Sequence, residues 1–212
     1  MDDRITDLPA RGLIERLASS EPIPGGGSAS ALAGAMGAAL VHMVVSLTSG
    51  RSGAAEQEAE LSEIAVAAAA CQSELLNLAD LDAVAYDAVI RARRLPKDTD
   101  LERQARAVQV AAVTREATRA PMQAARVAAT VLDLAERLAP IGNRNAISDV
   151  GVGALLAAAA IRGAALNVRI NLPYLDDAEP LRDEAASEIE RLLSGLDERE
   201  RAIRAAVEAR LE

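Results

Sequence analysis

Residues 28–48 read SASALAGAMGAALVHMVVSLT, a run of small and apolar residues without a charged side chain. Because alanine is the best helix former, this run predicts one long helix. A helix that is apolar on every side lies either in the centre of a bundle or in a membrane. We favour a bundle and no membrane, because Ala29–Leu47 is rich in Ala, Gly and Ser and has no Trp/Tyr belt or flanking basic cluster.

The composition of the whole chain supports an all-α fold. The 212 residues include 48 alanines, whereas aromatic residues make up only 1% of the chain. Alanine is depleted in strands, and no segment shows a convincing strand pattern. The length is sufficient for one large domain, and no linker divides the chain. We therefore expect residues 1–212 to form a single-domain bundle of six to seven helices.

Glycine, proline and capping residues set the expected helix boundaries. Thr99 and Glu102 match a capping box, and Pro121 is expected to break or kink the helix that contains it. The expected helices run from Thr6 to about Ser19, Ser28 to Ser49, Ala54 to Arg94, Thr99 to Pro121, Pro121 to about Ala139, Ser148 to about Ile170, and Asp177 to the C-terminus. Besides the capping box, the expected N-cap residues are Thr6, Ser28, Ser148 and Asp177.

Charge and rare residues exclude several classes of protein. A net charge of −9 and a pI near 4.8 argue against a nucleic-acid partner, which a basic surface would bind. With one His (His42) and one Cys (Cys71), the chain lacks the residues for a His/Cys metal site, so no metal is expected. The single cysteine fits a reducing compartment, and no signal peptide is recognisable at the start. We expect a cytoplasmic protein.

The uncharged helix also predicts self-association. One of its faces carries larger apolar side chains, and the other carries Gly34, Gly37, Ala38 and Val41. Both faces need a partner, and a twofold-related copy can supply one of the missing layers. A homodimer is therefore expected, with the helix at Ala29–Leu47 or its neighbours in the interface.

Three carboxylates lie close together on the third expected helix. Asp87 has Arg91 four residues further on, which favours a surface ion pair. Asp80 and Asp82 have no charged helical neighbours. A desolvated carboxylate on such a face has a raised pKa and suits general acid–base catalysis near neutral pH. The spacing does not choose between Asp80 and Asp82, and an exposed helix acid is the commoner role for each.

A glycine run marks a second candidate region. Gly25, Gly26 and Gly27 precede Ser28 at a helix start, where the backbone N–H groups are free and glycine lets a ligand approach them. The run matches neither a Walker A loop nor a dinucleotide-binding fingerprint. A plain turn explains it equally well.

A third candidate region combines amide, guanidinium and carboxylate groups. Gly142, Asn143 and Arg144 form a polar loop, and Asp149 follows in the first turn of the next helix. Such groups suit the recognition of a polar heterocycle. That helix ends with polar side chains that indicate a specific binding partner, namely Asn167, Arg169 and Asn171.

These segments, in this order, resemble the cyclodeaminase/cyclohydrolase family, which comprises the C-terminal domain of formiminotransferase-cyclodeaminase and stand-alone methenyltetrahydrofolate cyclohydrolases. The similarity covers roughly residues 4–200. Its motifs are PGGGS at 24–28, MVVSLT at 43–48, DAVAY at 82–86, RLPK at 94–97, GN at 142–143, SDVGVG at 148–153 and NVRIN at 167–171.

The resemblance implies a dimeric helical enzyme that binds a tetrahydrofolate derivative near the dimer interface. The family's catalytic aspartate lies in an Asp-x-x-Ala-Tyr/Phe pattern, which selects Asp82 over Asp80 and places Tyr86 beside it. The substrate-binding residues are then Gly25, Gly26, Gly27, Ser28, Tyr86, Gly142, Asn143, Arg144, Asp149, Asn167 and Asn171. The glutamate tail of the folate would meet Arg51, Arg144 or Arg169.

The implied reaction is one of two. Either 5-formimino-tetrahydrofolate cyclises to 5,10-methenyl-tetrahydrofolate and ammonia, or water opens the methenyl compound to 10-formyl-tetrahydrofolate. Both need positioning and proton transfer, and no cofactor beyond the tetrahydrofolate substrate is expected.

The alternative is a non-catalytic helical dimer that binds folate or a protein partner. A non-catalytic relative would be expected to lose Asp82 or Gly142-Asn143. This chain has both, which favours an enzyme over a binding protein.

Overall fold

The computed structural model describes residues 4–50 and 55–211, and within them it contains helices and no strand. The all-α prediction is confirmed. The α-helices are α1 (Ala10–Leu17), α2 (Gly26–Thr48), α3 (Ala55–Arg93), α4 (Asp100–Leu138), α5 (Ile147–Asn171), α6 (Pro180–Leu193) and α7 (Leu196–Glu208), and the short 3₁₀ helices are η1 (Ile5–Asp7), η2 (Arg144–Ala146) and η3 (Leu172–Tyr174).

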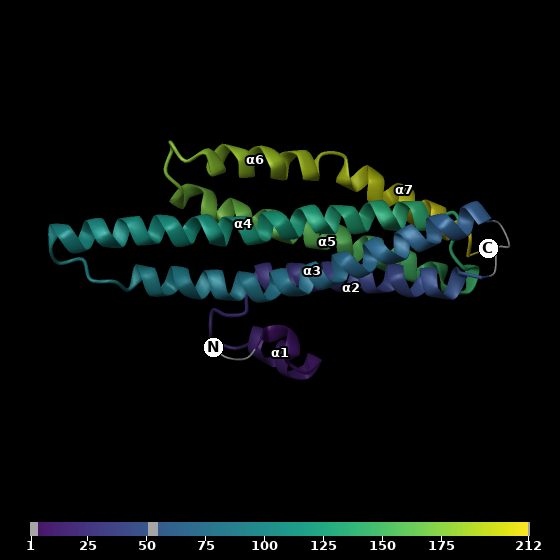
Figure 1. The fold of residues 1–212 in the computed structure, drawn as a ribbon, viewed down its shortest axis with the longest axis horizontal. Helices are drawn as coiled ribbons and strands as arrows, with labels where there is room; N and C mark the ends of the chain where they lie inside the picture. Colours follow the sequence, from purple (N-terminus) through teal and green to yellow (C-terminus); the bar gives the residue numbers. More distant parts are fainter. Residues whose placement is uncertain (1–3, 51–54, 212) are drawn as a thin grey trace.

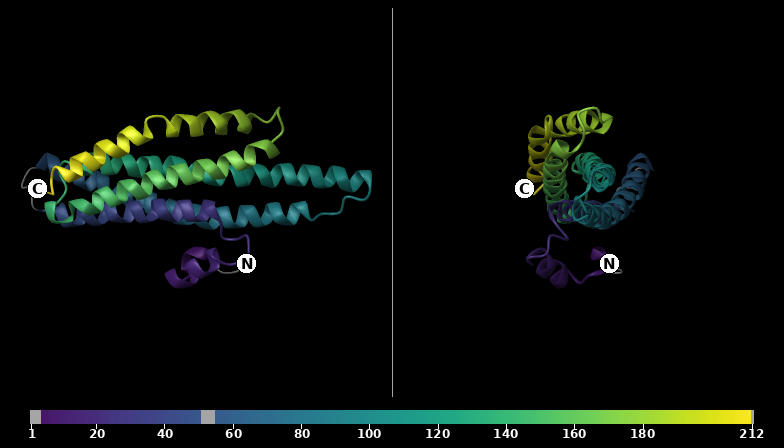
Figure 2. Two further views of the ribbon diagram at one scale, coloured as in Figure 1. Left: turned by 180° about the vertical axis from the view of Figure 1, so that it is seen from behind. Right: turned by 90° about the vertical axis from the view of Figure 1, so that its left-hand side faces the viewer.

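Four long helices form the body of the molecule. α2 packs against α3 and α5, and α4 packs against the same two helices, so the four surround one apolar core (Figure 1). α6 and α7 cover one side of this bundle, and α1 lies on the opposite side (Figure 2). The hairpin of α3 and α4 extends past the ends of α2 and α5 (Figure 1). This arrangement brings the start of α2 beside the end of α5.

The glycine-rich face of α2 is filled by the same chain. Gly34, Gly37, Ala38 and Val41 are buried. A Cβ atom on Gly37 would lie only 2.8 Å from the carbonyl oxygen of Gly153 on α5, so the two backbones approach too closely for any side chain. The small-residue face of α2 therefore packs closely against α5 of the same chain.

Two predicted helix boundaries are wrong. α4 is continuous through Pro121, which is buried in the core, because packing on both sides holds the helix despite the lost backbone hydrogen bond. The single helix expected from Asp177 onward is two helices. Gly195, with φ of 71°, turns the chain between them in a left-handed conformation that glycine adopts without strain.

Of the predicted caps, only the capping box is present. The Thr99 side chain accepts a hydrogen bond from the Glu102 backbone N–H at 3.2 Å, and the Glu102 side chain accepts one from the Thr99 N–H at 2.8 Å. The other four predictions are wrong, because α1, α2, α5 and α6 begin after Pro9, Gly25, Ala146 and Glu179. Two of those hydroxyl side chains, Thr6 and Ser28, instead contact aspartates of α3.

Three segments are long and apolar enough to cross a membrane, judged by length and composition alone. They are Gly26–Thr48, Ala55–Arg93 and Arg144–Tyr174. Half of the most apolar stretch of Gly26–Thr48 is buried inside the bundle.

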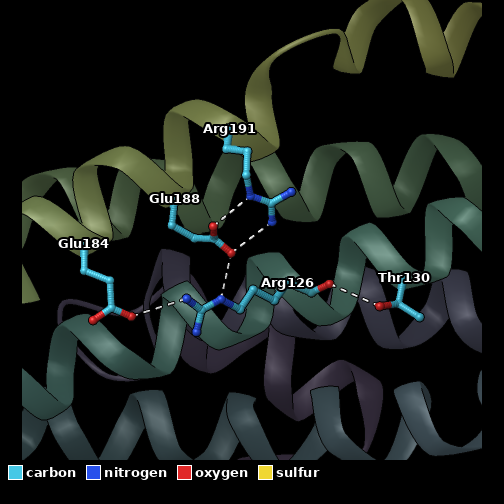
Figure 3. Close-up of polar contacts among 5 residues, drawn as sticks. All are labelled: Arg126, Thr130, Glu184, Glu188 and Arg191. Atoms are coloured by element: carbon cyan, nitrogen blue, oxygen red, sulfur yellow. Dashed lines mark hydrogen bonds and ion pairs between the residues drawn. The ribbon is translucent and has the colours of Figure 1, made fainter.

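Ion pairs join α6 to α4. The Arg126 Nε donates to Glu188 at 2.8 Å, Arg191 donates two hydrogen bonds to the same carboxylate at 2.9 and 3.0 Å, and Glu184 lies 3.5 Å from Arg126 (Figure 3). The hydrogen bonds from Arg191 and Arg126 lower the pKa of Glu188 from its ordinary value of 4.5 to about 2. The charged form of Glu188 therefore stabilises the docking of α6.

Replacing Glu188 with Gln should lower the free energy of unfolding at pH 7 by about 1–2 kcal/mol, the range for charge-assisted bonds that are partly screened by solvent. Because the folded-state pKa is depressed, this stabilisation exists above the ordinary pKa and is lost as the pH falls toward about 2. Urea unfolding should show a difference at pH 3 less than half of that at pH 7. Glu190→Gln, which removes an exposed partner 3.7 Å from Arg169, is the control and should cost little at either pH. Equal losses for both variants would contradict the prediction.

Candidate functional site

A cavity of about 260 Å³ lies where the start of α2, the middle of α3 and the end of α5 meet. Many of the predicted site residues line it: Gly25, Gly26, Gly27, Asp82, Tyr86, Asn167 and Asn171. Its walls also contain residues that the sequence did not single out, namely Pro22, Ile23, Ala83, Ala117 and Ile170. The structure thus brings together the glycine run, the DAVAY segment and the end of the NVRIN segment.

Asp82 is the acidic side chain among the described residues that line this cavity. The buried Ser28 hydroxyl lies 3.0 Å from the Asp82 carboxylate and 3.0 Å from the carbonyl oxygen of Ala79. Burial raises the pKa of the Asp82 carboxyl, and the hydrogen bonds from the Ser28 hydroxyl and backbone N–H partly oppose that rise. A carboxyl with a raised pKa in a cavity is suited to take up and release a proton near neutral pH.

The glycines at the start of α2 let the helix approach this carboxylate. A Cβ atom on Gly27 would overlap the Asp82 carboxylate, so any residue other than glycine there would force that carboxylate to move. A Cβ atom on Gly26 would meet the Asn167 side-chain nitrogen at 3.4 Å, an ordinary contact. The first N–H groups of a helix have no backbone partner within it. Here the N-cap residue Gly25 supplies no side-chain cap, the Ser28 N–H donates to the Asp82 carboxylate, and Gly25, Gly26 and Gly27 line the cavity. The glycine run is therefore part of the cavity wall and not a plain turn.

The two asparagines at the end of α5 offer hydrogen-bond acceptors. The Asn167 amide nitrogen donates to the Gly163 carbonyl at 2.8 Å, and the Asn171 amide nitrogen donates to the Ala117 carbonyl at 2.9 Å. With the nitrogens occupied, the amide oxygens have no donor within residues 4–50 and 55–211. α4 takes part in the site through the backbone carbonyl of Ala117, which the sequence could not reveal because this contact does not depend on the side chain.

The other two aspartates of α3 are held in ion pairs. Asp80 accepts hydrogen bonds from Arg4 at 2.7 Å and from the Thr6 hydroxyl at 2.8 Å. Burial favours a higher pKa for Asp80, but these bonds outweigh it and lower the pKa. Asp87 pairs with Arg91 at 2.9 Å, as predicted. Among the three aspartates of α3, Asp82 is thus the one without a basic partner in the described part of the chain.

The predicted loop residues Gly142, Asn143, Arg144 and Asp149 do not line this cavity. They lie near the C-terminal end of α2, 22 residues from Gly26, or about 33 Å along a helix. The Asn143 N–H donates to the Thr48 hydroxyl at 2.9 Å, and the Arg144 Nε donates to the Arg210 carbonyl at 3.2 Å. Within this chain, Gly142, Asn143 and Arg144 bind helix ends and the C-terminal segment, and they and Asp149 lie apart from the cavity of Asp82. Their role in substrate binding stays a prediction.

The arginines expected to meet a glutamate tail are also elsewhere. Arg144 binds the C-terminal segment, Arg169 lies 3.7 Å from Glu190 of α6, and Arg51 lies outside the described residues. Neither Arg144 nor Arg169 lines the cavity of Asp82.

A larger, more open hollow of about 550 Å³ lies between α3 and α4 near the end of their hairpin. Its acidic residue, Glu102, belongs to the capping box, and the Thr99 hydrogen bonds lower its pKa. In the part of the chain that the structure describes, no three His, Cys, Asp or Glu side chains are grouped as a metal site. The cavity of Asp82 therefore remains the best candidate for chemistry.

Known proteins are similar to this chain over most of its length. The family model for formiminotransferase-cyclodeaminase matches residues 9–191. The methenyltetrahydrofolate cyclohydrolase of Methylorubrum extorquens is 45% identical, over 85% of this chain and 86% of the relative. The formimidoyltransferase-cyclodeaminase of Mus musculus is 30% identical over all of this chain, which spans only 39% of that protein.

The fold has a match of the same kind. The crystal structure of formiminotetrahydrofolate cyclodeaminase from Thermotoga maritima superposes with a TM-score of 0.84 at 27% identity, and the match covers 97% of this chain and 98% of that one. The sequence motifs, the cavity around Asp82 and these similarities agree. The chain belongs to the formiminotransferase-cyclodeaminase family.

Proposed function

We propose that this protein is an enzyme of tetrahydrofolate one-carbon metabolism that hydrolyses 5,10-methenyl-tetrahydrofolate to 10-formyl-tetrahydrofolate. The observation that carries the proposal is Asp82, a half-buried carboxyl of raised pKa held by Ser28 inside a cavity. The choice of hydrolysis is supported by the 45% identity to a cyclohydrolase of similar length.

Asp82 supplies the proton transfers that this reaction needs. Its ionised carboxylate accepts a proton from water as the water oxygen bonds to the carbon between N5 and N10. The tetrahedral carbon then forms a carbonyl and breaks its bond to N5, which takes up the proton from Asp82. The second water proton leaves to solvent. One carboxyl that both accepts and returns a proton is sufficient, and burial, which raises its pKa, makes the protonated form more accessible than in an exposed aspartate.

The cavity suits the pterin end of the substrate. The free amide oxygens of Asn167 and Asn171 can accept hydrogen bonds from the pterin N–H groups, and Tyr86 and Ile170 offer apolar contact. A volume of about 260 Å³ is small for a whole folate, since ligand pockets generally run from about 300 Å³ upward. The benzoyl-glutamate part must therefore extend out of the cavity.

The second candidate is cyclodeamination of 5-formimino-tetrahydrofolate. It is favoured by the structural match to a cyclodeaminase and by the similarity to the mouse enzyme. N10 attacks the carbon of the protonated formimino group, Asp82 moves the N10 proton to the resulting amino nitrogen, and ammonia leaves as the methenyl cation forms. The same carboxyl serves both reactions, because both pass through a tetrahedral carbon between two nitrogens.

An absorbance assay separates the two candidates. Purified protein mixed with 5,10-methenyl-tetrahydrofolate should make the methenyl absorbance fall faster than in buffer. A rise of that absorbance with 5-formimino-tetrahydrofolate, and no enzymatic fall with the methenyl compound, would instead assign the protein as a cyclodeaminase. No enzyme-dependent change with either compound would overturn the proposed activity.

The proposal includes a soluble cytoplasmic homodimer that needs no cofactor beyond its substrate. The transferred carbon keeps its oxidation level, so the reaction requires proton transfer alone. α2 and α5 pack side by side, and both expose apolar side chains that a second copy could cover: Met36, Met43, Leu47, Val152, Leu155, Leu166 and Ile170. Light scattering of the purified protein measures this assembly directly.

A further inference from the structure

A paired arginine and tyrosine lie just beyond the cavity of Asp82. The guanidinium carbon of Arg93 is 4.6 Å from the centre of the Tyr174 ring, a cation–π contact. Tyr174 belongs to η3, which begins directly after the cavity residue Asn171. Arg93 lies seven residues after Tyr86 and eleven after Asp82, spacings that keep all three on one face of α3. The pair therefore lies beyond the cavity along α3 and η3, on the same face of α3 as Asp82 and Tyr86, although neither residue lines the cavity itself.

The spacing along α3 matches the part of a folate that the cavity cannot hold. Eleven residues of α-helix separate Asp82 from Arg93 by about 17 Å. From ordinary bond lengths, a p-aminobenzoyl group with one glutamate extends about 11 Å beyond the pterin, and an arginine side chain reaches about 6 Å toward it. A substrate whose reactive carbon lies at Asp82 thus brings its glutamate carboxylates within reach of Arg93.

The positive charge of Arg93 is not neutralised by a carboxylate in the described part of the chain. Most arginines in the described residues are paired with carboxylates, whereas Arg93 makes no ion pair in that part of the chain. Arg94 and Lys97, which follow it at the end of α3, make none there either. Arg93, Arg94 and Lys97 thus place three cationic side chains within five residues, followed by the acidic residues Asp98, Asp100 and Glu102 at or just before the start of α4.

We propose that Arg93, held over the Tyr174 ring, binds the carboxylates of the substrate's glutamate tail. The inference rests on the proposed function and adds a specificity residue to it. A planar guanidinium can bind a carboxylate through two parallel hydrogen bonds. Tyr174 acts as a positioning residue, because its ring holds the guanidinium in place before the substrate arrives and offers an apolar surface to the benzoyl ring.

The test compares two substrates, 5,10-methenyl-tetrahydrofolate and the tetrahydropteroate analogue that lacks glutamate. Arg93→Ala should raise the KM for the folate about 10- to 100-fold, the effect of losing a charge-assisted hydrogen bond. Its kcat for the folate, and both constants for the pteroate analogue, should stay within about twofold of wild type. Arg201→Ala removes an exposed arginine of α7, remote from the cavity, and should change neither substrate's KM.

Two Tyr174 variants test the positioning role. Tyr174→Phe keeps the ring face and should preserve the preference for folate over pteroate, whereas Tyr174→Leu should reduce that preference several-fold. Circular dichroism of each variant confirms that the bundle is folded.

Two results would overturn the inference: an unchanged folate KM in Arg93→Ala, or an equal rise of KM for both substrates. If wild-type protein turns over neither compound, the proposed function fails separately. Calorimetry with p-aminobenzoyl-glutamate and p-aminobenzoate then still tests Arg93. Wild type should bind the glutamate conjugate more tightly, and Arg93→Ala should remove the difference. Equal binding of the two compounds by wild type would contradict the inference.

Discussion

Replacing Asp82 with Asn should lower turnover of the methenyl or formimino substrate by about 10²–10⁴-fold, the usual range for loss of a positioned acid–base group. Asparagine keeps the shape of the side chain and can accept a hydrogen bond from Ser28, but it cannot exchange a proton. The affinity for folate should change much less than kcat, because the lost interaction acts mainly in the transition state. Steady-state kinetics and equilibrium binding measure the two effects separately.

The pH profile gives a second readout of the same residue. If ionised Asp82 is the base of the hydrolysis, kcat/KM should fall as the pH drops through its pKa, which burial raises above the ordinary value. This acid limb should be missing from the residual activity of Asp82→Asn. Asp80→Asn and Asp87→Asn are matched controls on the same helix and should stay within a few-fold of wild type. An active Asp82→Asn beside an inactive Asp80→Asn would refute the assignment.

Replacing Gly27 with Ala should also reduce turnover strongly, by about 10²-fold, while the protein remains folded. The added methyl group overlaps the Asp82 carboxylate, so the carboxylate must move, and a misplacement of about 1 Å can cost that much activity. Alanine is otherwise a better helix former than glycine, so far-UV circular dichroism should not decline.

Gly26→Ala is the control for this substitution. Its methyl group would meet only the flexible Asn167 side chain at 3.4 Å, so kcat should fall no more than a few-fold. If Gly27→Ala retains wild-type kcat, then the carboxylate position seen here is not the one required for catalysis.

The helical content was predictable because it depends on local sequence. Alanine and the Thr99–Glu102 capping box act within a few residues, and both predictions are confirmed. Pro121 shows the limit of local reasoning, since its helix is preserved by contacts with residues distant in sequence. The choice between Asp80 and Asp82 has the same limit, because it depends on Arg4 and Thr6, more than 70 residues away.

The role of the polar loop at Gly142–Arg144 could not be determined from the sequence, for a physical reason. Amide and guanidinium groups in a short loop serve equally well to bind a ligand or to satisfy backbone groups at helix ends. Here the Asn143 amide nitrogen donates to the Leu47 carbonyl at 3.0 Å, and Arg210 donates to the Gly142 carbonyl. Sequence alone does not show which helix ends are nearby, so it could not distinguish the two uses.

The Ser28 hydroxyl has one proton and two acceptors at equal distance, the Ala79 carbonyl and the Asp82 carboxylate, each 3.0 Å away. When Asp82 is ionised, the hydroxyl proton can point to the carboxylate. When Asp82 takes up a proton, the hydroxyl can turn to Ala79 and accept the new O–H in return. Rotation about a single C–O bond therefore satisfies both protonation states, with no movement of heavy atoms. Asp82 can therefore gain and lose a proton during each turnover with little rearrangement of the surrounding atoms. Such a preorganised site favours catalysis by proton transfer.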